Sequence, residues 1–227
     1  MKTVNLDLID HSYPIWINYS LTDRICFLLE TYKSTKWVFF TQKSIYRYWE
    51  NRLIGILEKD KIDYEIIFLE EGERGKSIKL ISNIYNRLIK MGCNRDTIFL
   101  GLGGGVVGDA TGFIASTFMR GVSYFQIPTT LLSMVDSSIG GKTAINTSKG
   151  KNLVGSFYQP KGVLIDPDFL DTIKDEEIFS AVSEIAKYGI LFDKSFFSYL
   201  NKNLKSIINR NANILLNIII RCCEFKA

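Results

Sequence analysis

The stretch Gly101-Leu102-Gly103-Gly104-Gly105-Val106-Val107-Gly108-Asp109 follows the apolar run 97–100 and leads into a helix-like segment that ends near Phe118. An apolar strand that breaks into glycines and resumes as a helix lets backbone N–H groups approach an anion. The glycines match G-x-G-x-x-G, a dinucleotide-binding pattern. The match is weak alone, because Gln126-Ile127-Pro128 stand where an acidic residue is expected about 20 positions later. A tight, closely packed strand-to-helix turn is the alternative.

Strands and helices alternate on both sides of this turn. Apolar spacing predicts strands over 3–8, 15–17, 37–41, 64–69, 97–100, 123–127 and 163–165, and helices over 21–32, 45–57 and 78–89. This order predicts an α/β fold, a Rossmann-like parallel sheet covered on both faces. Residues 129–160 are expected to form a long irregular, functional segment. The chain beyond about Asp175 is expected to be helical, which predicts one domain over 1–175 and another over 176–227.

Composition excludes several classes of protein. The 227 residues are 46% hydrophobic with a net charge of +4, and the lysines are scattered, so we expect no nucleic-acid partner. No apolar run suits a leader or a membrane span, which predicts a cytoplasmic protein without a membrane partner. Four cysteines without C-x-x-C spacing predict reduced, structural thiols. The single histidine, His11, gives little support to a Ser-His or Cys-His catalytic pair.

Two groups of charged residues are candidates for contacts near the glycine turn, a loop before it and an acid at its end. The charged loop Glu71-Gly72-Glu73-Arg74-Gly75-Lys76 follows the strand 64–69, and ligands bind outside the carboxyl ends of parallel strands. Glu73 can accept hydrogen bonds from ribose hydroxyls there, and Lys76 can face a phosphate. The alternative is that the charged loop is simply solvated. Asp109 is either an ordinary first-turn acid or a group that orients a nicotinamide and its ribose.

Two later stretches carry candidate substrate and metal contacts. Asp136 to Thr143 superficially resembles a P-loop, but Asp136 replaces the required first glycine, so nucleoside triphosphate binding is not supported. Lys142, with 149–152 close behind, offers ammonium donors to a phosphate-bearing substrate, unless the loop is merely exposed. Along the helix 177–192, Glu184 and Lys187 share one stripe. They form either a solvated ion pair or a metal-ligating carboxylate beside a cation, and periodicity leaves both open.

Together these stretches resemble the 3-dehydroquinate synthase family, from about Tyr13 to the last residue. The resemblance is densest in a series of blocks that keep the family's order: 101–109, 118–122, 127–132, 135–143, 150–155 and 184–189. Gln42 stands where the family often has Asn, and Asp171 replaces a residue that is commonly basic or neutral.

The resemblance implies an NAD cofactor and a divalent metal, zinc or cobalt. Implied cofactor contacts are Glu71, Gly72, Glu73, Arg74, Gly75, Lys76, Gly105, Val106, Val107, Gly108, Asp109, Thr129, Thr130, Lys142, Lys151, Phe169, Leu170, Asp171 and Thr172. Implied catalytic or substrate contacts are Arg120, Asp136, Lys142, Asn152 and Lys187, and the implied metal ligand is Glu184. Residues 1–175 are then an NAD-binding domain, and 176–227 are an incomplete metal and substrate domain.

The implied activity is a phosphate-eliminating cyclisation of a sugar phosphate, 3-deoxy-D-arabino-heptulosonate 7-phosphate, by a homodimer. The family's two metal-binding histidines have no counterpart before Ala227, and the apolar segment 214–220 expects further partners. We therefore expect an N-terminal portion of such an enzyme, inactive alone. Another sugar-phosphate cyclase, or a non-catalytic NAD-binding remnant, is the alternative.

Overall fold

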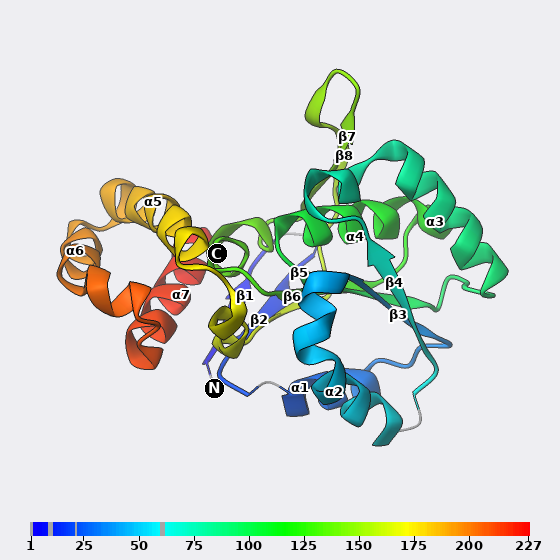
Figure 1. Ribbon diagram of the computed structural model, residues 1–227, viewed down its shortest axis with the longest axis horizontal. Helices are drawn as coiled ribbons and strands as arrows, with labels where there is room; N and C mark the ends of the chain where they lie inside the picture. Colours follow the sequence, from blue (N-terminus) through cyan, green and yellow to red (C-terminus); the bar gives the residue numbers. More distant parts are fainter. Residues whose placement is uncertain (1, 9–10, 21, 60–61) are drawn as a thin grey trace.

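A computed structural model describes residues 2–8, 11–20, 22–59 and 62–227, which form a sheet region and a helical region (Figure 1). The sheet has seven strands in the order β1-β2-β9-β6-β5-β3-β4. Its strands are β1 (Lys2–Leu6), β2 (Tyr13–Ile17), β3 (Trp37–Gln42), β4 (Tyr64–Leu69), β5 (Ile98–Gly103), β6 (Tyr124–Pro128) and β9 (Gly162–Ile165). All neighbours pair in parallel except β1 and β2, which are antiparallel. The predicted Rossmann-like fold is confirmed, with one antiparallel edge strand added.

Helices cover both faces of this sheet. On one face α1 (Thr22–Thr31) and α2 (Lys43–Lys59) bury residues such as Leu28 and Leu57, and on the other α3 (Ile78–Lys90) and α4 (Gly105–Thr117) bury Ile84 and Ile114. Every residue of β3 and β5 is consequently buried. Continuous burial of this kind is typical of central strands in a parallel sheet.

The expectation of an irregular segment over 129–160 is wrong. A π-helical turn, η3 (Ser133–Ser137), is followed by a hairpin of β7 (Lys142–Thr147) and β8 (Gly150–Phe157). The hairpin projects from the body of the molecule (Figure 1), and its base packs on α4, where a Cβ at Gly112 would lie 2.3 Å from Thr143 Cγ2. Because β8 is exposed along nearly its whole length, it shows no alternation of apolar and polar residues.

Smaller differences concern single residues. β6 includes Pro128, one residue beyond the predicted strand 123–127. β5 continues past the predicted strand 97–100 through the first glycines to Gly103. Cys93 follows the end of α3, where it is buried as a free thiol. Short 3-10 turns occur at η1 (Gly72–Lys76), η2 (Phe118–Arg120) and η4 (Pro167–Thr172).

The helical region consists of α5 (Asp175–Phe192), α6 (Lys194–Ile208) and α7 (Ala212–Lys226). The segment 214–220 was expected to lack partners, but α7 packs against β1, β2, η3 and α5, and Ile218, Ile219 and Cys222 are fully buried. The exposed apolar side chains of this region lie on α5 and α6 instead, among them Phe179, Leu191 and Phe197. The division at residue 175 stays a prediction.

Among the described helices, none combines the length and the apolar character that crossing a bilayer requires.

Candidate active site

The glycine turn joins the end of β5 to the start of α4. Gly104 is the N-cap of α4, in extended conformation (φ −75°, ψ −171°), and offers no side chain to the first amides of the helix. A Cβ at Gly103 would lie 2.5 Å from Val107 Cγ2, and a Cβ at Gly108 would lie 2.5 Å from Gln126 Oε1. Close packing therefore explains Gly103 and Gly108, while Gly104 leaves the helix N-terminus open to an anion.

A cavity of about 490 Å³ lies in front of this N-terminus. Its lining comes from the segments that follow β3, β4, β5, β6 and β9, so it occupies the carboxyl edge of the parallel sheet. The lining residues are Gln42, Ser44, Ile45, Tyr48, Glu71, Gly72, Gly104, Gly105, Val106, Thr129, Thr130, Thr172, Ile173, Lys174 and Glu177. We call this space the first cavity; its volume is within the range of ligand sites.

The base of the glycine turn contains an unsatisfied polar atom. Ser137 Oγ is buried without a hydrogen-bond partner among the described residues, and a Cβ at Gly105 would lie 3.0 Å from it. Buried polar atoms normally find partners, so this hydroxyl is an exception under the glycine turn. Ser137 lines neither cavity, so the helix N-terminus is the feature here that fits an anionic group of a nucleotide.

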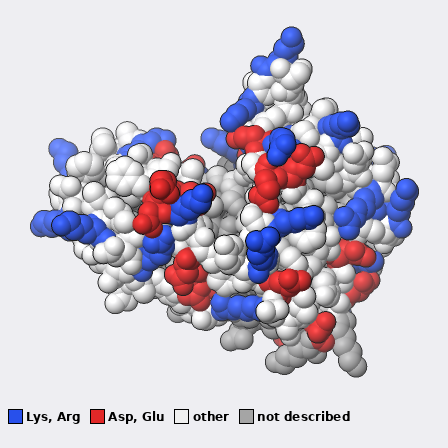
Figure 2. All heavy atoms as spheres, viewed as in Figure 1, with Lys and Arg blue, Asp and Glu red and all other residues white. Residues whose placement is uncertain are grey.

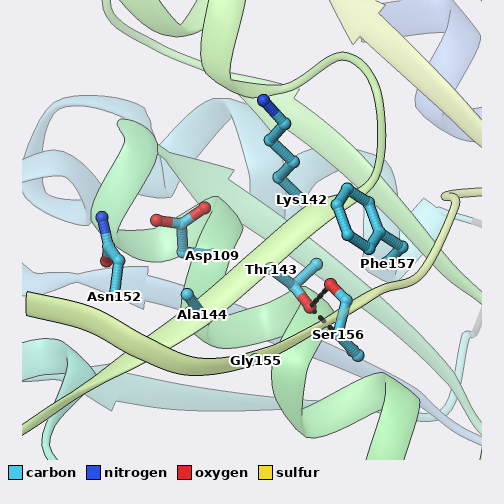
Figure 3. Close-up of a pocket in the computed structure, with 8 residues that line it drawn as sticks. All are labelled: Asp109, Lys142, Thr143, Ala144, Asn152, Gly155, Ser156 and Phe157. Carbon is cyan, nitrogen blue, oxygen red and sulfur yellow. Dashed lines mark hydrogen bonds between the residues drawn. The ribbon is translucent and has the colours of Figure 1, made fainter.

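A second cavity, of about 340 Å³, lies between α4 and the hairpin. Asp109, Lys142, Thr143, Ala144, Asn152, Gly155, Ser156 and Phe157 line it. Figure 3 shows the carboxylate of Asp109 between the side chains of Asn152 and Lys142. The Thr143 and Ser156 hydroxyls lie 3.0 Å apart at its floor, so this cavity offers an ammonium, an amide and hydroxyl groups to a polar substrate.

Lys76 connects the second cavity to the loop after β4. Its buried Nζ donates to Asp109 Oδ2 at 2.8 Å and to Asn152 Oδ1 at 2.7 Å. Burial raises the pKa of Asp109, although the hydrogen bond and charge of Lys76 oppose that rise. One buried cation therefore fixes an acid on α4 and an amide on the hairpin.

Glu73 makes the same connection at the surface. Its Oε2 accepts from Asn146 Nδ2 at 2.7 Å, and its Oε1 lies 3.2 Å from Lys151 Nζ. The Asn146 hydrogen bond is the main cause that lowers the pKa of Glu73; burial opposes it, and the Lys151 hydrogen bond and the charges of Lys76 and Lys151 support it. Both carboxylate oxygens of Glu73 thus bond to side chains of the hairpin.

Asp136 is the centre of a third polar cluster, beside Ser137 of the turn. Its Oδ1 accepts from Lys226 Nζ at 2.6 Å and from the Tyr188 hydroxyl at 3.0 Å. Burial disfavours the Asp136 carboxylate, but the hydrogen bond and charge of Lys226, with the bond from Tyr188, outweigh it and lower the pKa. Asp136 is therefore held ionised between α5 and α7.

Glu184 and Lys187 form an ion pair, one of the two alternatives that their spacing leaves open. Lys187 Nζ lies 2.9 Å from Glu184 Oε1, and this hydrogen bond, with the charges of Glu184 and Asp136, raises the pKa of the exposed lysine. Neither residue lines the first or the second cavity.

The residues that the structure describes do not make a complete metal site. They contain no group of three or more His, Cys, Asp or Glu side chains placed to hold an ion. Glu184 is paired with Lys187, and His11 is exposed in the link between β1 and β2. A catalytic zinc site uses three protein ligands, so this donor set does not fit one by itself.

The structure brings many of the sequence-predicted site residues together. Glu71, Gly72, Gly105, Val106, Thr129, Thr130 and Thr172 line the first cavity. Asp109, Lys142 and Asn152 line the second cavity, and Lys76 donates to both Asp109 and Asn152. Glu73 and Lys151 join the loop after β4 to the hairpin. Lys142, expected to contact both cofactor and substrate, lines the second cavity alone.

Other predicted residues lie apart from the cavities. Gly75, Val107, Gly108, Phe169 and Leu170 are buried in the packing behind them, and Arg74 and Asp171 are exposed outside the lining. Arg120 is exposed at the opposite end of α4 from the glycine turn and lines neither cavity. As α4 has 13 residues, about 20 Å of helix lies between them.

Several lining residues were missed from the sequence. Ser44 and Tyr48 begin α2 directly after β3, and the carboxyl-edge rule alone would have found them. Thr143, Ser156 and Phe157 were hidden by the unrecognised hairpin. Tyr188 and Lys226, which hold Asp136, have no sequence signal, because they depend on how α5 and α7 pack.

Comparison with known proteins gives matches along the chain. The family model described as 3-dehydroquinate synthase N-terminal matches residues 66–180, and the one described as 3-dehydroquinate synthase C-terminal matches residues 181–227. A 3-dehydroquinate synthase of Pseudoalteromonas atlantica is 42% identical over all 227 residues. The chain spans 63% of that relative's length.

Solved structures share the fold. The 2-epi-5-epi-valiolone synthase ValA from Streptomyces hygroscopicus, with NAD+ and Zn2+ bound, superposes with a TM-score of 0.88 at 24% identity, over 97% of this chain and 61% of its own. A 2-deoxy-scyllo-inosose synthase complexed with carbaglucose-6-phosphate, NAD+ and Co2+ gives 0.78 at 21% identity, over 98% of this chain and 64% of its own. At these identities the likeness concerns the fold. The two consecutive family matches, over residues 66–227, carry the assignment: the chain belongs to the 3-dehydroquinate synthase family.

Proposed function

We propose that this chain binds NAD in the first cavity and takes part in a 3-dehydroquinate synthase reaction. That reaction converts 3-deoxy-D-arabino-heptulosonate 7-phosphate to 3-dehydroquinate and phosphate. The observation that carries the proposal is the open N-terminus of α4 at the carboxyl edge of the sheet, in a member of this family. The relatives that share the fold include enzymes crystallised with NAD+.

The cofactor would be held by groups from several strand ends. The backbone amides of Gly105 and Val106 would face its diphosphate, the place that a helix N-terminus favours for an anion. Thr129, Thr130, Glu71 and Thr172 supply hydroxyls and a carboxylate around it. NAD held by these residues would supply reversible hydride transfer with a substrate alcohol.

The substrate would occupy the second cavity. Lys142 and Asn152 present donors to a phosphate group, and the Lys76–Asp109 pair lies beside them with its carboxylate toward the cavity. These residues bind and orient the sugar phosphate, so that phosphate loss and ring closure occur in a fixed geometry. Asp136 and Lys187 are proposed as further contacts; Arg120 stays a prediction of the sequence resemblance.

Glu184 is proposed as a carboxylate metal ligand. The described residues supply no three-ligand group with it. A homodimer and a cytoplasmic location also stay predictions.

On the face shown in Figure 2, acidic and basic side chains are intermixed.

The cofactor proposal is tested by calorimetric titration of NAD into the wild-type chain and a Gly104→Asp variant. Asp is a favoured N-cap, and its Cβ, like that of Ser, would lie 3.2 Å from Thr130 Cγ2, so the two variants share this contact and differ in charge. The new carboxylate opposes a diphosphate at the same amides. NAD affinity should fall more than about 10-fold. Gly104→Ser, which introduces a neutral N-cap, is the matched control, and its NAD affinity should fall much less than that of Gly104→Asp. Equal NAD affinity in all three proteins would contradict the assignment of the diphosphate.

The reaction is tested by phosphate release from the heptulosonate phosphate with NAD and Zn2+ or Co2+, using the longest available form of the protein. Release from another sugar phosphate only would indicate a different cyclase. NAD binding without phosphate release from any of them would indicate a non-catalytic nucleotide-binding protein.

A further inference from the structure

Arg210 lies in the link between α6 and α7 with its backbone in the left-handed region, at φ 55°. The position just after a helix commonly has this conformation, and glycine or asparagine is the residue that it favours. Asn209 and Asn211 flank Arg210, yet the arginine takes the left-handed place. The backbone alone therefore does not explain the choice of residue, and the side chain must be considered.

The guanidinium of Arg210 is fixed by four acceptors. Its Nε donates to Leu170 O at 3.0 Å, its Nη2 to Ile173 O at 2.7 Å and its Nη1 to Ile208 O at 3.2 Å. Nη2 also lies 2.8 Å from Asp175 Oδ1. The side chain is only 24% exposed. A rigid planar fork can reach these separate acceptors at once, which an ammonium on a flexible stem cannot.

One of these acceptors, Ile173, lines the first cavity, and two others, Leu170 and Asp175, lie within three residues of it in the chain; Ile208 belongs to α6. Leu170 is in η4. The three residues Thr172, Ile173 and Lys174, which come shortly after Leu170 in the chain, line the cavity. Asp175 begins α5, and Glu177 of the same helix also lines the cavity. Arg210 does not line the cavity itself. It holds the corner between η4 and α5 from behind.

We propose that Arg210 is a positioning residue for the cofactor, which holds the wall 172–177 in the geometry that binds NAD. This inference rests on the proposed function, since NAD is assigned to that cavity. Arg210 thereby joins the helical region, through the end of α6, to the cofactor side of the sheet. The affinity for NAD depends on this contact, although Arg210 does not line the cavity.

Arg221 provides a matched control within the same helices. Its side chain is 26% exposed, it forms an ion pair with Asp193, and its guanidinium stacks over Phe196 at 4.5 Å. These contacts fasten α7 to the corner between α5 and α6, remote in sequence from η4. A merely structural arginine of similar burial should behave like Arg221.

The experiment compares wild type, Arg210→Ala, Arg210→Lys and Arg221→Ala, each well below its own melting temperature. NAD affinity is measured by calorimetry, and hydrogen exchange of the amides over 170–177 is measured without NAD. We expect Arg210→Ala and Arg210→Lys to bind NAD about 10-fold more weakly, as hydrogen bonds to charged groups are lost, and to exchange faster over 170–177. Arg221→Ala should melt at a lower temperature with affinity and exchange over 170–177 unchanged.

Either of two results overturns the inference: wild-type exchange over 170–177 in both Arg210 variants, or an equal loss of NAD affinity in Arg221→Ala. If Arg210→Ala does not fold, Arg210→Lys decides, and full recovery of affinity by the lysine would also overturn it. If wild type fails to bind NAD, the proposed function fails, and the inference fails with it even where the Arg210 contacts still protect 170–177 from exchange.

Discussion

Lys226 Nζ lies 2.6 Å from Asp136 Oδ1, although 90 positions of sequence separate the two residues. Asp136 follows β6 in the turn η3, beside the hydroxyl of Ser137 under the glycine turn, and Lys226 ends α7. The contact therefore holds the last helix against the carboxyl edge of the sheet. It also keeps a charged carboxylate where the sequence predicts a substrate contact.

The stability that Asp136 contributes should be lost in acid. Burial is the largest single effect and opposes its ionisation, but the hydrogen bond and charge of Lys226, the hydrogen bond from Tyr188 and the charge of Lys187 together outweigh it and lower the pKa below the ordinary 3.8. A lowered folded-state pKa gives stability that is present above the unfolded value and lost as the pH falls through the folded value. Urea unfolding should find wild type about 1 kcal/mol more stable than Asp136→Asn at neutral pH, and the two should converge in acid. Asp63→Asn, at an exposed ion pair, is the control; a difference that persists unchanged in acid contradicts the prediction.

The Lys76–Asp109 pair should show strong coupling. Lys76→Met leaves a mostly buried carboxylate without its cation, and should lower the free energy of unfolding by about 3 kcal/mol. Asp109→Asn combined with Lys76→Met removes both charges and should recover part of that loss. A double-mutant cycle by denaturant unfolding measures the coupling, and additive single effects would show that the pair contributes nothing specific.

Gly103 and Gly55 should respond in opposite ways to alanine. A Cβ at Gly103 would lie 2.6 Å from Val107 Cβ, so Gly103→Ala must displace the first turn of α4 and should cost about 2 kcal/mol. Gly55, inside α2, has nothing within 4 Å of its added Cβ, and Gly55→Ala should gain about 0.5–1 kcal/mol. Thermal unfolding of both variants gives the comparison. A neutral Gly103→Ala would mean that the turn is loosely packed.

Glu71 should stabilise the start of α2. Its Oε1 accepts from Ser44 N at 3.1 Å, and its Oε2 lies 2.9 Å from Ser44 Oγ. The carboxylate thus acts as a cap supplied by a neighbouring strand end, and Glu71→Gln should cost about 0.5–1 kcal/mol. Glu70→Gln is the adjacent control, because Glu70 only approaches the exposed Arg74 at 3.9 Å. Equal unfolding midpoints for the two variants would rule out the cap.

The glycine turn could be predicted because its signal is local. An apolar strand followed by glycines and a helix fixes both the turn and its place at the carboxyl edge of the sheet, and Glu184 and Lys187 meet because helical residues three apart are neighbours. The charged loop 71–76 was found by the same edge rule. In each case the information lies within one element or in the order of neighbouring strands.

The missed features have two causes, the solvent exposure of the hairpin and packing between distant segments. The strands β7 and β8 escaped prediction because β8 has solvent on both faces, so its side chains show no period of two. The burial of α7 was missed because its apolar residues are as consistent with an absent partner as with β1 and η3. The contacts of Arg210 and Lys226 join segments dozens of residues apart, and no local pattern encodes them.

The projecting hairpin has a consequence for handling the protein. Its turn presents the exposed Lys149 at the end of a narrow two-stranded stalk, the kind of loop at which proteases cut first. A trypsin digest of the folded chain should therefore begin at this tip and yield two large fragments that stay associated through the sheet. The rate of that first cut becomes a simple reporter of whether anything is bound between the hairpin and α4.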